Sequence, residues 1–389
     1  MDRAPRATHA KSGVALRFLN VAGSVAALLV VVACASPGTP PGGPVDTQAP
    51  QIVRIAPDSG KTGVKPREVI FKFDEVVNER PSGAASIEAL FLISPRNGEP
   101  QADWHRTEIA VHPRRGFKPN TTYTIILLPG LSDLRGNTRN TGAVTVFSTG
   151  PTLASSRLMG VLFNWAEGRT IPRGLIEARP VTDTSTVYVT TTDSAGSFTF
   201  RNIPPARYRV RGISDDNNNR GLDPREPYDT TLVTVADSAK VELLAFVHDS
   251  IGARLSGVNV RDSATLELIF DNPLSVTNPP GAASIRVRAS DSTDVPVASV
   301  AAPPPDTTAA KVSKPSRPIP LRTLIVRLAR PLRLKVSYRV RVTDAQNLIG
   351  VARTSEREVV LPPPIIPLLT TKPPPAVVPP VSPPAPVKK

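Results

Sequence analysis

The sequence predicts an all-β protein in which several β-sandwich domains follow one another and a proline-rich segment closes the chain. Three observations support this prediction. Short segments alternate apolar and polar residues at period two, and turn residues bound them. Proline is abundant, with 44 of 389 residues, while aromatic residues make up only 5% of the chain. The periodicity of a long amphipathic helix is absent from the sequence.

The first 33 residues have the features of an export signal. A basic N-terminal stretch precedes an apolar run over residues 21–32, and the small residue Ala33 follows that run. The run is too short to span a bilayer, which takes roughly 20 residues. Cys34 comes next and is the only cysteine in the chain, so we expect no intramolecular disulfide.

The tetrapeptide Val-Val-Ala-Cys that ends at Cys34 resembles the lipobox of bacterial lipoproteins. The resemblance implies that residues 1–33 are cleaved off and that Cys34 carries acyl chains, such as palmitate, that anchor the protein in a membrane. Residues 34–50 would form a tether. Ala35 stands where an aspartate would favour retention in the inner membrane, which implies the outer membrane in a Gram-negative source. The alternative is an ordinary signal peptide that contains a cysteine by chance.

The net charge of the chain after residue 33 indicates which kind of partner it would bind. The whole chain carries a formal charge of +14, and the first 33 residues hold four basic residues and one acidic residue, so +11 remains after cleavage. Such an excess favours anionic partners, which in an envelope are phospholipid, lipopolysaccharide or acidic glycan. Because the protein is exported, we expect no nucleic-acid partner.

The clearest strand pattern follows the tether. Val69, Phe71 and Phe73 fall on one face of an extended segment at period two, as a half-buried strand requires. A second strand is expected through Tyr123, with a turn at residues 133–137 after it.

Residues 51–150 as a whole resemble the SbsA-like Ig-like domain of bacterial S-layer and surface proteins. The matching features are turn and strand positions: Pro57 with Gly60, Phe71 to Glu75, Asn120 to Tyr123, Asp133 with Gly136 and Asn137, and Phe147 to Gly150. The resemblance implies a β-sandwich without catalytic residues, because the family is defined by framework positions.

Residues 151–248 have a different pattern. A turn at 193–196 precedes a Phe-x-Phe strand at 198–200, and a Pro-x-x-x-Tyr-x-Val segment follows at 204–210. Arginines alternate with apolar residues from 207 to 212. This set resembles the carboxypeptidase regulatory-like, or transthyretin-like, fold, which implies a small β-sandwich with no activity of its own.

Residues 249–360 repeat the first domain in a weaker form. Three pairings support the repeat: Leu266 to Asp271 with Val69 to Asp74, Tyr338 with Tyr123, and Asp344 and Asn347 with Asp133 and Asn137. The second copy is longer, and its extra residues fall in the proline-rich segment 301–320, which predicts a surface-loop insertion. Chance convergence of two sandwiches is the alternative. Residues 361–389 hold twelve prolines and predict a disordered, extended tail.

One loop has the oxygen-ligand spacing of a calcium site. Counting from Asp215, the first, third, fifth, ninth and twelfth positions of the loop are Asp215, Asn217, Asn219, Asp223 and Glu226. The sixth position is Arg220, where a calcium loop needs glycine. Asn and Asp are also common in ordinary turns. Both hypotheses remain open: a weak extracytoplasmic Ca²⁺ site, or an Asn/Asp turn.

A basic row predicts a second candidate site. The even positions from Leu332 to Val342 are apolar, and the positions between them include Arg333, Lys335, Arg339 and Arg341. This row is either a solvated sheet face that discourages edge pairing or a face that binds anions.

The sequence favours a lipid-anchored envelope protein that acts as a non-catalytic binding or scaffolding module. No nucleophile motif or phosphate loop is present, and Trp104 is more simply a framework residue than a ligand platform. We expect no required cofactor, with calcium the one candidate. The alternative is an envelope glycan hydrolase, or an accessory subunit of an envelope enzyme, whose carboxylates meet only in the fold.

Overall fold

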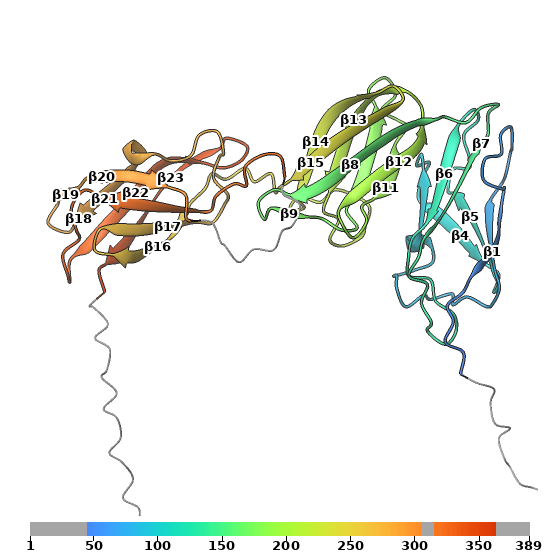
Figure 1. Ribbon diagram of the computed structural model, residues 1–389, viewed down its shortest axis with the longest axis horizontal. Helices are drawn as coiled ribbons and strands as arrows, with labels where there is room; N and C mark the ends of the chain where they lie inside the picture. Colours follow the sequence, from blue (N-terminus) through green and yellow to red (C-terminus); the bar gives the residue numbers. More distant parts are fainter. Residues whose placement is uncertain (1–44, 305–314, 363–389) are drawn as a thin grey trace, which may run out of the picture.

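The computed structural model describes residues 45–304 and 315–362, which form six β-sheets arranged as three two-sheet sandwiches (Figure 1). The only helices in these ranges are single 3₁₀ turns, η1 (Glu88–Leu90) and η2 (Ala282–Ser284). The predicted all-β class is therefore confirmed. Each sandwich surrounds its own apolar core, because a sheet with one apolar face must bury that face against another layer.

In the first sandwich, a sheet with the order β1-β2-β5-β4 faces a sheet with the order β3-β6-β7. Val69, Phe71 and Phe73 of β2 are at most 2% exposed, and Lys72 between them faces solvent, as the period-two pattern predicts. The seven strands are β1 (Ile52–Ala56), β2 (Val69–Phe73), β3 (Phe91–Ser94), β4 (Pro100–Trp104), β5 (Glu108–Pro113), β6 (Thr122–Leu127) and β7 (Ala143–Ser148).

The second sandwich pairs a sheet with the order β11-β10-β13-β14 with a sheet with the order β12-β8-β15, in which β9 also pairs with β8. A Cβ atom on Gly160 of β8 would lie 2.5 Å from the ring of Phe198, so this position requires glycine. The strands are β8 (Ser156–Asn164), β9 (Arg169–Thr170), β10 (Leu175–Pro180), β11 (Tyr188–Thr191), β12 (Ser197–Ile203), β13 (Ala206–Ile213), β14 (Tyr228–Val235) and β15 (Ser238–Ala245).

The third sandwich repeats the first strand for strand. Its sheets have the orders β16-β17-β21-β20 and β19-β18-β22-β23, which match those of the first sandwich once the two-residue β19 is set aside. In this match β17 takes the place of β2, and β22 takes the place of β6. The strands are β16 (Leu255–Asp262), β17 (Thr265–Phe270), β18 (Ile285–Ala289), β19 (Asp294–Val295), β20 (Val297–Ala301), β21 (Thr323–Leu328), β22 (Ser337–Gln346) and β23 (Ala352–Val360).

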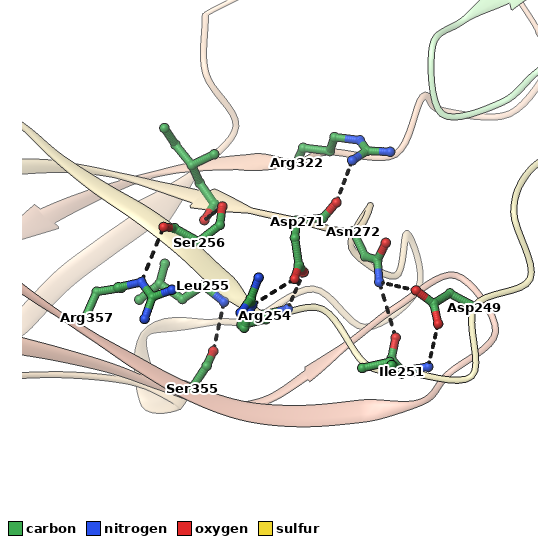
Figure 2. Close-up of polar contacts among 11 residues, drawn as sticks. Asp249, Ile251, Arg254, Leu255, Ser256, Asp271, Asn272, Arg322, Ser355 and Arg357 are labelled. Atoms are coloured by element: carbon green, nitrogen blue, oxygen red, sulfur yellow. Dashed lines mark hydrogen bonds and ion pairs between the residues drawn. The ribbon is translucent and has the colours of Figure 1, made fainter.

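Two aspartates make the same contacts in the two repeated sandwiches. Asp74 accepts a 2.8 Å bond at Oδ1 from the N–H of Gln51 and donates its own N–H to the Gln51 carbonyl at 3.0 Å. Asp271 forms the same two bonds with Arg254, at 2.8 and 3.0 Å (Figure 2). Each aspartate therefore ties the residue before the first strand to the residue after the second.

The turn after β6 corrects one predicted pairing. Asp133 accepts at Oδ1 from the backbone N–H groups two and four residues later, at 2.9 and 2.7 Å. In the third sandwich, Asn347 forms the equivalent bonds at 3.1 and 2.9 Å. Asn347 is thus the counterpart of Asp133. Asp344, the predicted counterpart, lies within β22 at a register shift, with φ of 52°.

Each sandwich has one buried tyrosine whose hydroxyl holds the preceding loop. Tyr123, Tyr208 and Tyr338 are at most 1% exposed. Tyr123 and Tyr338 each accept a bond from the backbone N–H five residues earlier, at 2.7 and 2.8 Å. Tyr208 donates to the carbonyl four residues earlier, at 2.6 Å. Burial raises the pKa of Tyr123 and Tyr208, because the phenolate loses its hydration.

The first two sandwiches meet edge to edge through β3 and β11. The N–H of Val189 donates to Ser94 Oγ at 2.9 Å, and the N–H of Arg96 donates to the carbonyl of Val187 at 2.7 Å. Arg96 and Val187 thereby form one antiparallel bridge. Both strands lie at an edge of their sheets, so the contact covers two edges that would otherwise be open to pairing.

The second sandwich lies between the other two (Figure 1) and also contacts the third. Residues 315–320, the described end of the predicted insertion, are mostly exposed, as a surface loop requires. Two hydrogen bonds nevertheless tie them to the second sandwich: Trp165 Nε1 donates to the Pro318 carbonyl, and the Ser316 N–H donates to Glu242, both at 2.9 Å. The insertion therefore also serves as an interdomain contact.

Candidate functional site

The predicted signal peptide, the lipidation residue Cys34 and the tail beyond residue 362 lie outside the described residues. The lipid anchor therefore stays a prediction. Within residues 45–304 and 315–362, no helix has the length and apolar character needed to cross a membrane.

The predicted calcium loop joins β13 to β14, and its two end carboxylates bind the loop's own backbone. Asp215 accepts two N–H bonds, both 3.0 Å long, from the residues four and five positions later. Glu226 is 7% exposed and accepts bonds of 3.2 and 3.0 Å from the residues ten and three positions earlier. These bonds define the path of the loop.

The other three predicted ligands meet at one carboxylate. Asn217 and Asn219 donate from Nδ2 to Asp223 Oδ2, at 2.6 and 2.9 Å. Calcium would instead require the amide oxygens, because a metal ion binds the carbonyl side of asparagine. Hydrogen bonds thus link all five predicted residues within one loop, but the carboxylate oxygens of Asp215, Asp223 and Glu226 do not all lie within 4.8 Å of one another. The ion itself stays a prediction, and the turn hypothesis uses the same residues.

The structure explains why arginine occupies the sixth loop position. The side chain of Arg220 leaves the loop and donates from Nη2 to the carbonyl of Ala89 at 2.5 Å, in η1 of the first sandwich. Its backbone is left-handed, with φ of 59°. Burial lowers the pKa of Arg220, and the charge of Glu99 opposes that shift. The loop therefore holds the first two sandwiches together.

If the loop binds calcium, about 5 mM Ca²⁺ should stabilise the second sandwich by about 1 kcal/mol, since sites outside the cell have dissociation constants near 10⁻³ M. Thermal unfolding of the full chain, followed by fluorescence in a Trp104→Phe background that leaves Trp165 of the second sandwich as the only tryptophan, measures this effect with calcium or chelator. Asp215→Ala and Glu226→Ala should each abolish the calcium-dependent shift. Asp193→Ala, in another turn of the same sandwich, is the matched control and should retain it. Identical melting with calcium and chelator would mean an ordinary turn.

The predicted basic row of the third sandwich is only partly a strand. Because β22 begins at Ser337, the expected alternation fails before it: Leu334 is 52% exposed, and Lys335 is in a turn with φ of 60°. Arg339 and Arg341 do lie on the outer face of β22, since the residues between and beside them are buried. The four predicted residues therefore do not form one continuous face.

Acidic residues neutralise much of this row. Arg333 contacts Asp291 at 2.5 Å, and Arg339 lies 3.3 Å from Glu358 and 3.8 Å from Glu356. The Arg333 guanidinium holds the pKa of Asp291 well below its ordinary value. This charge compensation fits the solvated-face hypothesis better than the anion-binding hypothesis.

A hollow of about 490 Å³ lies beside Trp104 in the first sandwich. Trp104 Nε1 donates to the carbonyl of Val77 at 2.9 Å, so the indole is held in the framework, as expected. The lining also includes Glu79, Glu88 and Asp103. These three carboxylates share one hollow and are therefore candidates for the acidic pair that the hydrolase alternative requires.

Three acidic residues of the first sandwich, which the sequence did not indicate as a group, lie close together. Asp46, Glu75 and Asp133 place one carboxylate oxygen each within 4.8 Å of one another. Burial and the charge of Asp133 raise the pKa of Glu75. Burial also acts to raise the pKa of Asp133, but hydrogen bonds from Asn137 and its neighbours lower it overall. Asp133 accepts hydrogen bonds from the backbone and side chain of its own turn, and these bonds are sufficient to explain why its carboxylate is buried.

Comparison with known families identifies the first sandwich. The model of the bacterial Ig-like domain family matches residues 46–149. This segment is therefore similar to the bacterial Ig-like domain family. The match confirms the resemblance predicted from the turn and strand positions, and it covers the seven strands β1 to β7. The carboxypeptidase regulatory-like resemblance of residues 151–248 stays a prediction.

Several solved structures match the chain at low identity and with low TM-scores. A DUF3823 family protein from Parabacteroides merdae is 13% identical, covering 54% of this chain and 100% of its own, with a TM-score of 0.20. The N-terminal part of the bacterial S-layer protein SbsC is 16% identical, covering 57% and 48%, with a TM-score of 0.20. The Bacillus cereus major pilin subunit BcpA is 7% identical, covering 48% and 66%, with a TM-score of 0.18. No curated protein matches the chain.

Proposed function

We propose that this is a lipid-anchored protein of the cell envelope that binds or scaffolds other envelope components without catalysing a reaction. Acylation of Cys34 would hold it in the outer membrane, since several acyl chains together anchor stably where one is marginal. The +11 charge of the mature chain favours an anionic glycan or lipopolysaccharide as partner.

The observation that supports this proposal most strongly is the arrangement of three sandwiches in series. The bacterial Ig-like domain, the second sandwich and the repeated third sandwich present sheet faces one after another, with polar contacts at both junctions. Such a series suits a protein that reaches from a membrane surface to a partner. The lipobox-like sequence and the tether precede the first strand, which is the order that membrane attachment requires.

A pulldown against purified envelope polysaccharides, run beside a glycosidase panel on the same polymers, tests the binding function. We expect retention of an acidic polymer, released by salt, with no new reducing ends. As a control, Glu79→Gln with Glu88→Gln removes two carboxylates from the Trp104 hollow and should leave retention unchanged. Hydrolysis that disappears in this variant would contradict the proposal and support the glycan hydrolase alternative.

A further inference from the structure

Three arginines surround one buried carboxylate where the first two sandwiches meet. Glu177 of β10 is 4% exposed, and its Oε2 lies 3.1 Å from Arg179 Nη2 and 4.0 Å from Arg211 Nη1. Its Oε1 lies 3.5 Å from Arg96 Nη1, which comes from the first sandwich. We refer to these four residues as the seam cluster. It crosses the contact between β3 and β11.

The seam cluster has more donors and more positive charge than Glu177 can balance. Three guanidinium groups against one carboxylate leave an excess of two positive charges. Arg96 Nη2 and Arg211 Nε are buried and have no acceptor in the described part of the chain. A buried charged donor without an acceptor is costly. The Arg96 and Arg211 side chains as a whole are 21% and 32% exposed, although these two nitrogens are buried, so an oxyanion reaches them only after the side chains shift.

The outer face of the sheet that contains Glu177 carries further arginines beside the seam cluster. β13 places Arg207, Arg209 and Arg211 on its outer face, since the residues between them are buried. Arg179 of β10 lies directly opposite Arg209, and like charges in that position destabilise a sheet. Among the outward positions of β10, β11, β13 and β14, Glu177 is the only acid. An anion on this face would relieve the repulsion.

We propose that the seam cluster and the outer face of β13 bind phosphate groups of an anionic envelope polymer. This inference rests on the proposed binding function and gives it a location and a ligand chemistry. A guanidinium binds phosphate through two parallel N–H···O bonds, so the outward arginines of β13 are suitable ligands, and a shift of the Arg96 and Arg211 side chains would give their unpaired nitrogens acceptors as well. Alternate residues of a strand are about 7 Å apart, so the row offers successive charges to a chain of phosphates.

Polyphosphate binding to the full mature protein tests the proposal. Arg209 is exposed, and among the described residues it forms no ion pair within 4.0 Å, so Arg209→Gln should leave the fold intact. We expect this change to weaken polyphosphate binding about tenfold, and Arg211→Gln to weaken it at least as much. The matched control is Arg341→Gln, which removes another exposed, outward arginine that is likewise outside the ion pairs of the described chain. It should leave affinity unchanged.

Several results would overturn the proposal. One is equal polyphosphate affinity of the wild-type protein, Arg209→Gln and Arg211→Gln. Another is a loss confined to Arg341→Gln, which would move anion binding to the third sandwich. A third is binding to phosphatidylglycerol vesicles without binding to polyphosphate, which would identify a lipid surface as the partner. The polysaccharide pulldown that tests the proposed function is run on the same samples. Continued retention of an acidic polysaccharide alongside any such result would mean that this inference alone has failed.

Discussion

Replacing Tyr123 with alanine is expected to cost the first sandwich about 3–5 kcal/mol of unfolding free energy. Tyr123 is fully buried, its ring lies edge-on to Phe117 at 4.9 Å between centroids, and it stacks with Phe147 at 5.8 Å. Its hydroxyl accepts the N–H of Lys118. Alanine removes the aromatic contacts and leaves this donor unpaired. Because domains are stable by about 5–15 kcal/mol, a large part of the folding free energy is lost.

Urea unfolding followed by Trp104 fluorescence measures this effect. The chain has two tryptophans, so a Trp165→Phe background leaves Trp104 as the only reporter and confines the signal to the first sandwich. Tyr123→Phe keeps the ring and should cost about 1 kcal/mol for the lost hydrogen bond. Tyr338→Ala, the equivalent change in the third sandwich, should leave the Trp104 transition in place. An alanine variant no less stable than the phenylalanine variant would contradict the proposed packing of the core.

The sequence predicted the strands whose two faces differ most. In β2, Val69, Phe71 and Phe73 are buried, whereas Ile70 is only partly buried and Lys72 is exposed, so the period-two pattern indicates both the strand and its inner face. The same pattern identified β17 and β22 and led to the internal repeat. Framework residues such as Asp74 were also visible, because Asp271 stands at the same place in the repeated strand pattern of the third sandwich.

Contacts between sandwiches were not predictable from this pattern. Glu177 and Arg96 are 81 positions apart and meet only because β3 and β11 lie side by side, which no periodicity indicates. The alternation of arginines along β13 was one signal of these contacts that the sequence contained. Arg220 also indicated a contact outside its loop, but in the sequence it was visible only as a departure from the calcium-loop pattern. Its role in contacting η1 depends on where the loop lies in the fold.

Two sequence predictions failed for local reasons. Asp344 was paired with Asp133 by residue type, but an asparagine amide oxygen accepts the same backbone bonds as a carboxylate, so Asn347 holds the equivalent turn. Leu334 was assigned to a strand face because apolar residues continue at every second position. The turn at Lys335 breaks that alternation before β22 starts.

Replacing Cys34 with serine is expected to release the protein from membranes completely. A hydroxyl cannot replace the thiol as the acyl acceptor in the lipobox reaction that the sequence resembles, and the apolar run at 21–32 is too short to act as a membrane span. Without acyl chains, only weak electrostatic attraction between the basic protein and anionic lipid remains, and salt screens it. Ser36→Ala, a change in the adjacent tether, is the matched control and should keep the protein in the membrane fraction.

The lipid anchor is the central claim, and metabolic labelling with a fatty acid analogue tests it most directly. Cells expressing the wild-type protein, Ser36→Ala or Cys34→Ser are labelled, the membranes are washed with high salt, and the label on the purified protein is measured. We predict full label on the wild-type protein and Ser36→Ala, with none on Cys34→Ser and that variant in the soluble fraction. Equal label on all three proteins, or membrane retention of unlabelled Cys34→Ser after the salt wash, would contradict lipid anchoring at Cys34.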